Sequence, residues 1–168
     1  MKDAKLLVVG RPHQGNSAVD NVIRYVIASP FADTSEILSN QIRIDSLQHM
    51  IEDFYAVQAP LDMNEHRRVF HFVLTARDSH HKDAILMDGA QALLEYFSEI
   101  GHQALLVPHY GSEKNYANHH WHVVVNPISY INGQRLLDKF QTFSQMQEYL
   151  TRNTRAEWTW KYTVPDKK

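Results

Sequence analysis

Nine consecutive residues, Asn118-His-His-Trp-His-Val-Val-Val-Asn126, decide the fold of this chain. β-Branched and aromatic residues dominate the segment, which is typical of a β-strand. Side chains two residues apart on a strand project to the same face. One face of this strand therefore carries four residues: His120, His122, Val124 and Asn126. The opposite face carries three apolar residues that suit a core: Trp121, Val123 and Val125.

A second strand precedes this one and ends in another histidine, in the run Ala104-Leu-Leu-Val-Pro-His109. The intervening residues 110–118 are rich in Gly, Ser, Asn and Lys, so the two strands can form an antiparallel hairpin with a long loop. Two imidazoles side by side on a rigid strand make half of a metal site, and His109 can supply a third ligand. The sequence thus predicts a metal centre at His109, His120 and His122, with Asn126 either orienting one of the ligands or hydrogen-bonding a neighbouring strand.

The remaining patterns place this hairpin in a larger sheet. Apolar or alternating runs predict strands over residues 5–10, 68–75 and 157–164. Helical spacing of apolar residues predicts helices from Ser17 to before Pro30 and over residues 46–55, 83–100 and 141–152, while residues 31–44 are expected to be loop-rich. This order predicts an α+β fold, a largely antiparallel central sheet covered by helices.

Composition narrows the class of protein. The chain has 168 residues, of which 43% are hydrophobic, enough for one packed domain. It has no cysteine, which excludes disulfides and thiolate metal sites. It has no apolar run of membrane-spanning length, and its first residues do not resemble a signal peptide, so we expect a cytoplasmic protein with no membrane partner. The net charge of −2 argues mildly against a nucleic-acid binder.

Three other side chains need an interpretation. Tyr25 lies off the apolar stripe of the first predicted helix, so it is a candidate nucleophile, although a tyrosine at such an edge is usually packing. His71 is expected to be a satisfied sheet residue rather than a fourth ligand. His119 is expected to lie on the surface.

Several motifs together resemble a known family. The metal motif of the HUH endonucleases known as conjugative relaxases is similar to three segments: His109-Tyr-Gly-Ser, Asn118-His-His-Trp-His-Val-Val-Val-Asn126 and Asn132-Gly-Gln-Arg-Leu136. In the mobilisation-protein (MobP, VirD2-like) branch, the first motif is a helix carrying a nucleophilic tyrosine, which Val22-Ile-Arg-Tyr25-Val-Ile resembles. Arg68-Val-Phe-His-Phe-Val-Leu-Thr-Ala76 is similar to its second strand. The resemblance covers roughly residues 20–137 and implies that residues 1–168 form one relaxase-type nuclease domain.

The resemblance implies site-specific nicking and strand transfer on single-stranded DNA at an origin of transfer, which initiates mobilisation of a plasmid or integrative element. Tyr25 would attack the scissile phosphate, and a divalent ion at the three histidines would polarise it. The family implies Mn²⁺ or Mg²⁺, with Zn²⁺ as a further candidate for imidazole ligands. DNA contacts are expected from Arg24, Arg67, Arg135 and Tyr110, and accessory mobilisation proteins are expected partners.

Two other interpretations remain open from the residues. One is a metal-dependent hydrolase in which a three-histidine ion activates water. The other is a DNA-binding module that keeps the fold without catalysis. Replacing Tyr25 separates them, because only the relaxase needs its phenol.

Overall fold

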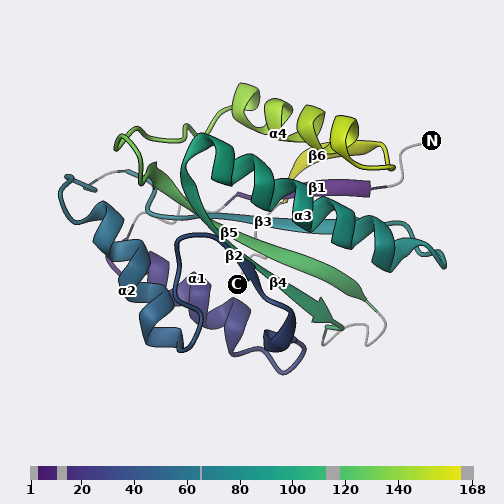
Figure 1. The fold of residues 1–168 in the computed structure, drawn as a ribbon, viewed down its shortest axis with the longest axis horizontal. Coiled ribbons are helices and arrows are strands. Elements are labelled where there is room, and N and C mark those ends of the chain that lie inside the picture. Colours follow the sequence, from purple (N-terminus) through teal and green to yellow (C-terminus); the bar gives the residue numbers. More distant parts are fainter. Residues whose placement is uncertain (1–3, 11–14, 65, 113–117, 164–168) are drawn as a thin grey trace.

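The computed structural model describes residues 4–10, 15–64, 66–112 and 118–163, and within them one sheet and its covering helices (Figure 1). The helices are α1 (Ala18–Ile27), α2 (Leu47–Gln58), α3 (Lys82–Ile100) and α4 (Phe140–Asn153), with a short 3-10 turn, η1 (Thr34–Glu36). The strands are β1 (Ala4–Val9), β2 (Leu38–Ser39), β3 (Phe70–Ala76), β4 (His102–Tyr110), β5 (His119–Ser129) and β6 (Trp158–Thr163).

The six strands form one sheet in the order β2-β4-β5-β3-β1-β6. Every neighbouring pair is antiparallel except β1 and β6, which run parallel. The predicted α+β class and its largely antiparallel sheet are therefore confirmed. The predicted hairpin is also present, because β4 and β5 pair antiparallel from His102 to Tyr110.

The larger core lies between the sheet and the layer formed by α3 and α4 (Figure 1). Its members come from five strands and both helices, and Trp121, Val123 and Val125 of β5 are fully buried in it. Gly89 of α3 lets the helix approach β6, because a Cβ atom there would lie 2.6 Å from the ring of Trp158. This core fixes the face of β5 that points away from the histidines.

The second core lies on the other face of the sheet, under α1 and α2. It contains Leu105 and Val107 of β4 and Val124 of β5, but none of its described members comes from β1 or β6. On that face, β1 presents Lys5, Leu7 and Val9, and Lys5 is exposed. The α1/α2 layer therefore covers one half of this face, and no helix among the described residues covers the β1–β6 half. We call this half the open face.

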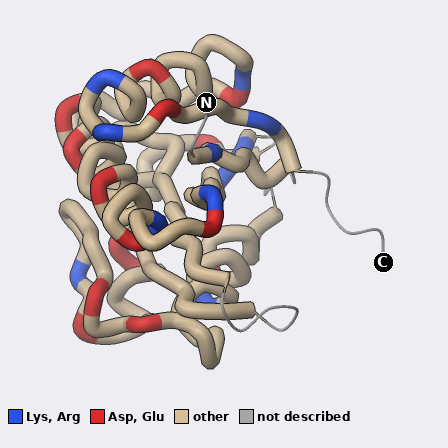
Figure 2. Tube along the Cα trace, turned by 90° about the vertical axis from the view of Figure 1, so that its right-hand side faces the viewer, with Lys and Arg blue, Asp and Glu red and all other residues tan. Residues whose placement is uncertain are grey.

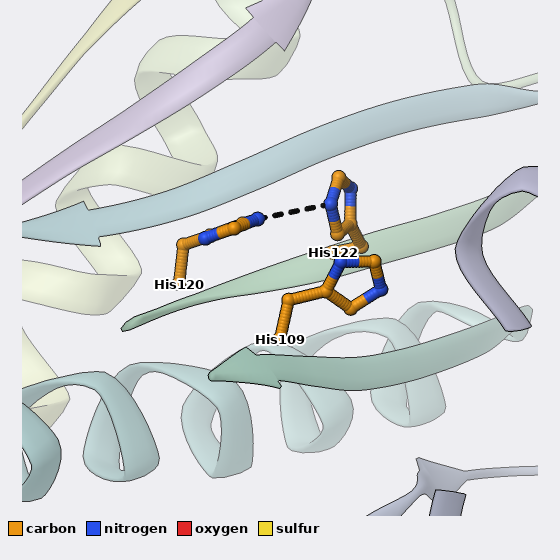
Figure 3. A group of neighbouring side chains, drawn as sticks. All are labelled: His109, His120 and His122. Atoms are coloured by element: carbon orange, nitrogen blue, oxygen red, sulfur yellow. Dashed lines mark hydrogen bonds between the residues drawn. The ribbon is translucent and has the colours of Figure 1, made fainter. Parts of the chain in front are cut away.

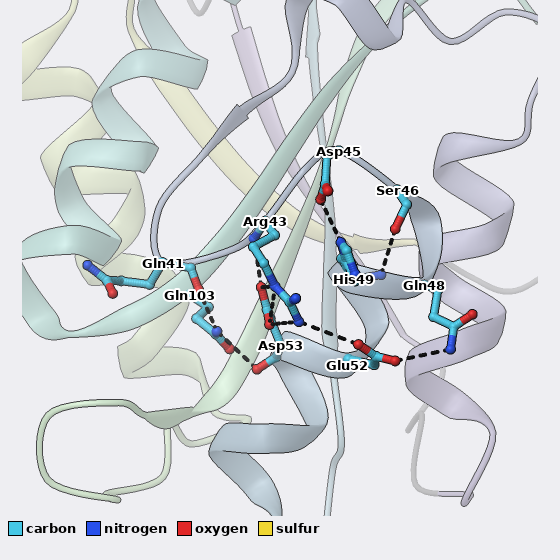
Figure 4. A network of polar contacts seen from close by, with 9 residues as sticks. All are labelled: Gln41, Arg43, Asp45, Ser46, Gln48, His49, Glu52, Asp53 and Gln103. Atoms are coloured by element: carbon cyan, nitrogen blue, oxygen red, sulfur yellow. Dashed lines mark hydrogen bonds and ion pairs between the residues drawn. The ribbon is translucent and has the colours of Figure 1, made fainter.

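Polar side chains tie α2 to the loop before it and to the sheet (Figure 4). Ser46 caps the helix, because its hydroxyl accepts a hydrogen bond from the backbone N–H of His49 at 3.1 Å. Asp53 accepts from the backbone N–H of Arg43 at 2.7 Å and from its guanidinium at 2.9 Å. Gln103 of β4 donates to the carbonyl of Gln41 at 2.8 Å and to that of Asp53 at 3.1 Å. These bonds hold α2 at a fixed place beside β4.

Most predicted elements agree with the structure to within a few residues. The strand β2 was not expected, because residues 31–44 show no periodicity and β2 is only two residues long. None of the described helices combines the length and apolar character that crossing a bilayer requires.

Candidate metal centre and active site

The β4–β5 hairpin brings the three predicted histidines together. His109 lies directly opposite His120 in the antiparallel register, and His122 lies opposite Val107, so all three side chains share the α1 face of the sheet. One ligand nitrogen from each ring lies within 4.8 Å of the other two. Figure 3 shows the rings converging from the two strands. The rings are nearly inaccessible, with exposures of 4% for His109, 8% for His120 and 4% for His122.

Hydrogen bonds to the backbone orient two of these rings. His109 Nε2 lies 2.8 Å from the carbonyl oxygen of Val26 in α1, and a carbonyl only accepts, so Nε2 carries the proton. His120 Nδ1 lies 3.0 Å from the carbonyl oxygen of Asn118 and carries its proton for the same reason. His109 Nδ1 and His120 Nε2 are then lone-pair nitrogens, which is the form that binds a metal.

The third ring is oriented by another imidazole. His122 Nδ1 lies 2.7 Å from Nε2 of His71 on β3, and His122 Nε2 lies 3.2 Å from His120 Nε2. His71 is thus a partner of a ligand, consistent with its expected place as a satisfied sheet residue. The sequence did not reveal the pairing, because it depends on the β3–β5 register, in which His71 faces Val124 and Val73 faces His122.

The electrostatics favour neutral, ligating rings. Burial lowers the pKa of His109 below its ordinary value, lowers that of His120 to about 4, and holds that of His122 well below its ordinary value. Since a metal binds the unprotonated imidazole, these residues fit a divalent ion. The set has three nitrogen donors and no carboxylate among the described residues, so it leaves coordination positions for a substrate.

Tyr25 lies at this centre. Its ring centroid is 5.7 Å from that of His122 and 6.2 Å from that of His71, in edge-on geometry. The buried stripe of α1 runs through Val19, Val22 and Val26, so position 25 points off it, and the side chain is 64% exposed. A phenol that is both exposed and next to the histidines can reach a substrate bound there.

The predicted DNA contacts divide into two groups. Arg24 is exposed beside Tyr25. Tyr110 follows His109 at the end of β4, but its side chain lies on the other face of the sheet, stacked on His119. Arg135, by contrast, pairs with Ile128, eight residues along β5 from His120, which is roughly 25 Å on an extended strand. Arg67 binds Asp138 at 2.6 Å and covers the ring of Phe70, at the same distant end. The sheet therefore places Arg67 and Arg135 far from the histidines.

Asn126 also has partners of its own. Its amide nitrogen donates to the carbonyl of Phe54 at 3.1 Å and to the side chain of Gln103 at 2.8 Å, and its oxygen accepts from Gln58 at 3.0 Å. These described bonds go to α2 and β4 and not to the three imidazoles.

The expectation that His119 lies on the surface is wrong. His119 is only 7% exposed, its Nδ1 bonds Asp83 at the start of α3, and its ring stacks on Tyr110 with centroids 4.3 Å apart. Its position is set by the β4–β5 pairing, which places Tyr110 opposite it. The side chain therefore packs on the α3 face, away from His109, His120 and His122.

The structure thus places a tyrosine of α1 beside three histidines carried by two neighbouring strands. A family model described as "Relaxase: MobA/VirD2-like, nuclease domain" matches residues 25–157. The chain belongs to this relaxase family, and the family implies a DNA-nicking enzyme. No curated protein and no solved structure gives a significant match.

Proposed function

We propose that this protein is a relaxase that nicks single-stranded DNA at an origin of transfer and passes the strand on, using Tyr25 as the nucleophile. One observation carries the proposal: the ring of Tyr25, whose phenol can form a phosphotyrosyl bond, lies against His122 of the three-histidine cluster. The family match, which begins at this tyrosine, supports the same function.

The reaction exchanges one phosphoester for another. The phenol oxygen of Tyr25 attacks the scissile phosphorus, the bond from phosphorus to the 3′ oxygen breaks, and a 5′-phosphotyrosyl adduct and a free 3′-hydroxyl result. The proton lost by the phenol is balanced by the proton gained by the 3′ oxygen. Because the number of phosphoester bonds does not change, the reverse step rejoins DNA without a nucleotide cofactor.

His109, His120 and His122 would hold the divalent ion. When bound, such an ion polarises the phosphate and stabilises the charge that develops on it. Imidazole ligands favour a transition metal, and oxygen-rich DNA favours Mg²⁺ or Mn²⁺. Mn²⁺ accepts both kinds of ligand, so we propose Mn²⁺ as the working ion, with Mg²⁺ and Zn²⁺ as the alternatives.

The open face gives the DNA a path to this centre. Cross-strand pairing puts His122, Val73, Leu7 and Lys161 in one row across β5, β3, β1 and β6. Three strand spacings of ~4.8 Å place Lys161 about 14 Å from His122. Lys5 lies in the next row, between Thr75 and Thr159.

The charge on this path suits a polyanion. The described residues of β1, β3 and β6 that point to the open face include two exposed lysines, Lys5 and Lys161, and no acidic residue. Figure 2 shows most of the acidic positions toward the left of that view. This asymmetry reconciles DNA binding with the net charge of −2. Arg24 completes the proposed contacts near the metal, and the path excludes Tyr110, Arg67 and Arg135.

The biological setting follows from the family. We propose a cytoplasmic protein in which residues 1–168 act as one nuclease domain, initiating mobilisation of a plasmid or integrative element together with accessory mobilisation proteins.

The decisive experiment traps the covalent adduct. The protein is incubated with Mn²⁺ and a pool of labelled single-stranded oligonucleotides, and the products are separated on a denaturing gel. We expect a slower band that resists denaturation, carries label on protein and disappears in Tyr25→Phe. Tyr162→Phe is the matched control, because that exposed phenol packs against Phe143 on the opposite face and should leave the band intact.

The same assay separates the other interpretations. Cleavage that persists in Tyr25→Phe without an adduct would identify a metal-dependent hydrolase. Retained DNA binding without any cleavage product would identify an inactive module of the same fold.

A further inference from the structure

The contact between His71 and His122 can hold its proton in two ways. A hydrogen bond needs one donor and one acceptor, so the 2.7 Å contact carries a proton on His122 Nδ1 or on His71 Nε2, but not on both. This choice determines whether Nε2 of His122 carries a proton or a lone pair, because a neutral imidazole has one N–H and one lone pair.

Without an ion, the contact between His122 and His120 favours the arrangement with the proton on His71 Nε2. His120 Nε2 presents a lone pair, since Nδ1 of that ring donates to Asn118. His122 Nε2, 3.2 Å away, satisfies this lone pair only if it carries the proton. His122 Nδ1 is then an acceptor, and His71 Nε2 must donate to it.

With His122 as a metal ligand, the arrangement with the proton on His122 Nδ1 is required. Nε2 must then present its lone pair, so the proton of His122 lies on Nδ1 and His71 Nε2 accepts it. We propose that His71 is a positioning residue that reverses its hydrogen bond with His122, holding the ring in one place in both the metal-free and the metal-bound site. This inference rests on the proposed metal centre.

Imidazole suits this position because it can donate or accept while both rings remain neutral. A carboxylate could only accept, so it would favour the metal-bound tautomer alone. An amide could do either. These differences predict distinct effects on Mn²⁺ affinity, which a residue that merely fills space would not produce.

Calorimetric titration of Mn²⁺ into the whole protein tests the proposal. We expect His71→Leu to weaken binding by ~10–100-fold, the usual effect of removing a partner of a metal ligand. His71→Gln should bind close to the wild type, and His71→Glu should bind more tightly, on the order of tenfold. His102→Gln is the control, since that buried histidine bonds the carbonyl of Asn126 at the opposite end of β4 and should leave Mn²⁺ affinity unchanged.

A second measurement uses no metal. Nitrogen-15 spectra of the histidine rings should show the proton of His122 on Nε2 in the metal-free wild type and on Nδ1 in His71→Glu. A wild-type His122 protonated on Nδ1 would overturn the inference, and so would equal Mn²⁺ affinity in the three His71 variants. A wild type that takes up no Mn²⁺ would overturn both this inference and the proposed function.

Discussion

At the residue scale, the buried histidines make the fold sensitive to acid. Burial lowers the pKa of four of them: His102, His109, His120 and His122. In the unfolded chain each ring has its ordinary pKa of about 6.5. Between the two values the unfolded chain binds protons that the folded chain does not, so acid favours unfolding.

We therefore expect the free energy of unfolding to fall as the pH drops below about 6.5. For His120, whose folded pKa is about 4, the loss continues to that pH and amounts to about 3 kcal/mol at ~1.4 kcal/mol per unit. Urea denaturation at pH 7, 6 and 5 measures how steeply the free energy of unfolding falls with pH. His120→Gln should make this fall shallower, and an unchanged fall in that variant would contradict the contribution assigned to His120.

The face of the sheet on which a side chain lies was predictable from the sequence where strand alternation sets it. The alternation of β5 placed His120 and His122 on one face, and the structure brings both next to His109. The partners of these rings were not predictable, because His71 and Val26 belong to segments that meet the hairpin only through the tertiary fold.

At the element scale, the amide cluster of Gln58, Gln103 and Asn126 fastens α2 to the sheet. All three side chains are buried, at 3%, 2% and 0% exposure. Asn126 bonds both of the others and the carbonyl of Phe54, so its removal takes a hydrogen-bond partner from each of these buried polar groups.

We expect Asn126→Ala to destabilise the fold by about 3 kcal/mol, because unpaired buried groups cost ~1–3 kcal/mol each. Mn²⁺ affinity should change little, since Asn126 is four residues from His122, about 13 Å along the strand. Thermal denaturation and metal titration of the same variant measure the two effects. A large loss of affinity with a small loss of stability would restore the predicted ligand-orienting role.

Elements differed in how readily the sequence revealed them. Alternation and amphipathicity predicted the long elements, whose buried faces are set by their own residues. The sheet order was not predictable, because β1 joins β3 and β6 through pairings between distant segments.

At the scale of the whole molecule, one face of the sheet is half covered. The α1/α2 layer packs over β4 and β5, and the rest of that face, with Lys5 and Lys161, lies next to the metal centre. A single strand crossing this face would meet cations before it reaches Tyr25.

We expect the double variant Lys5→Glu, Lys161→Glu to bind single-stranded DNA more weakly. The slope of log K against log salt concentration should become shallower by ~1.4, at ~0.7 per lost phosphate contact. Fluorescence anisotropy in the Tyr25→Phe background avoids adduct formation. Lys139→Glu is the matched control, an exposed lysine at the start of α4. Equal losses in the control and the double variant would indicate a nonspecific charge effect and exclude this path.

The parallel pairing of β1 with β6 has a consequence for biosynthesis. The first strand of this sheet to leave the ribosome pairs with the last, and Trp158, which packs against Gly89, is more than 150 residues from its partner Ala4. A nascent chain therefore cannot complete this sheet until residue 163 has been translated, and contacts between such distant segments form slowly. Protease digestion of stalled chains should show cleavage persisting until residue 163 has emerged from the exit tunnel, and early protection would refute this order.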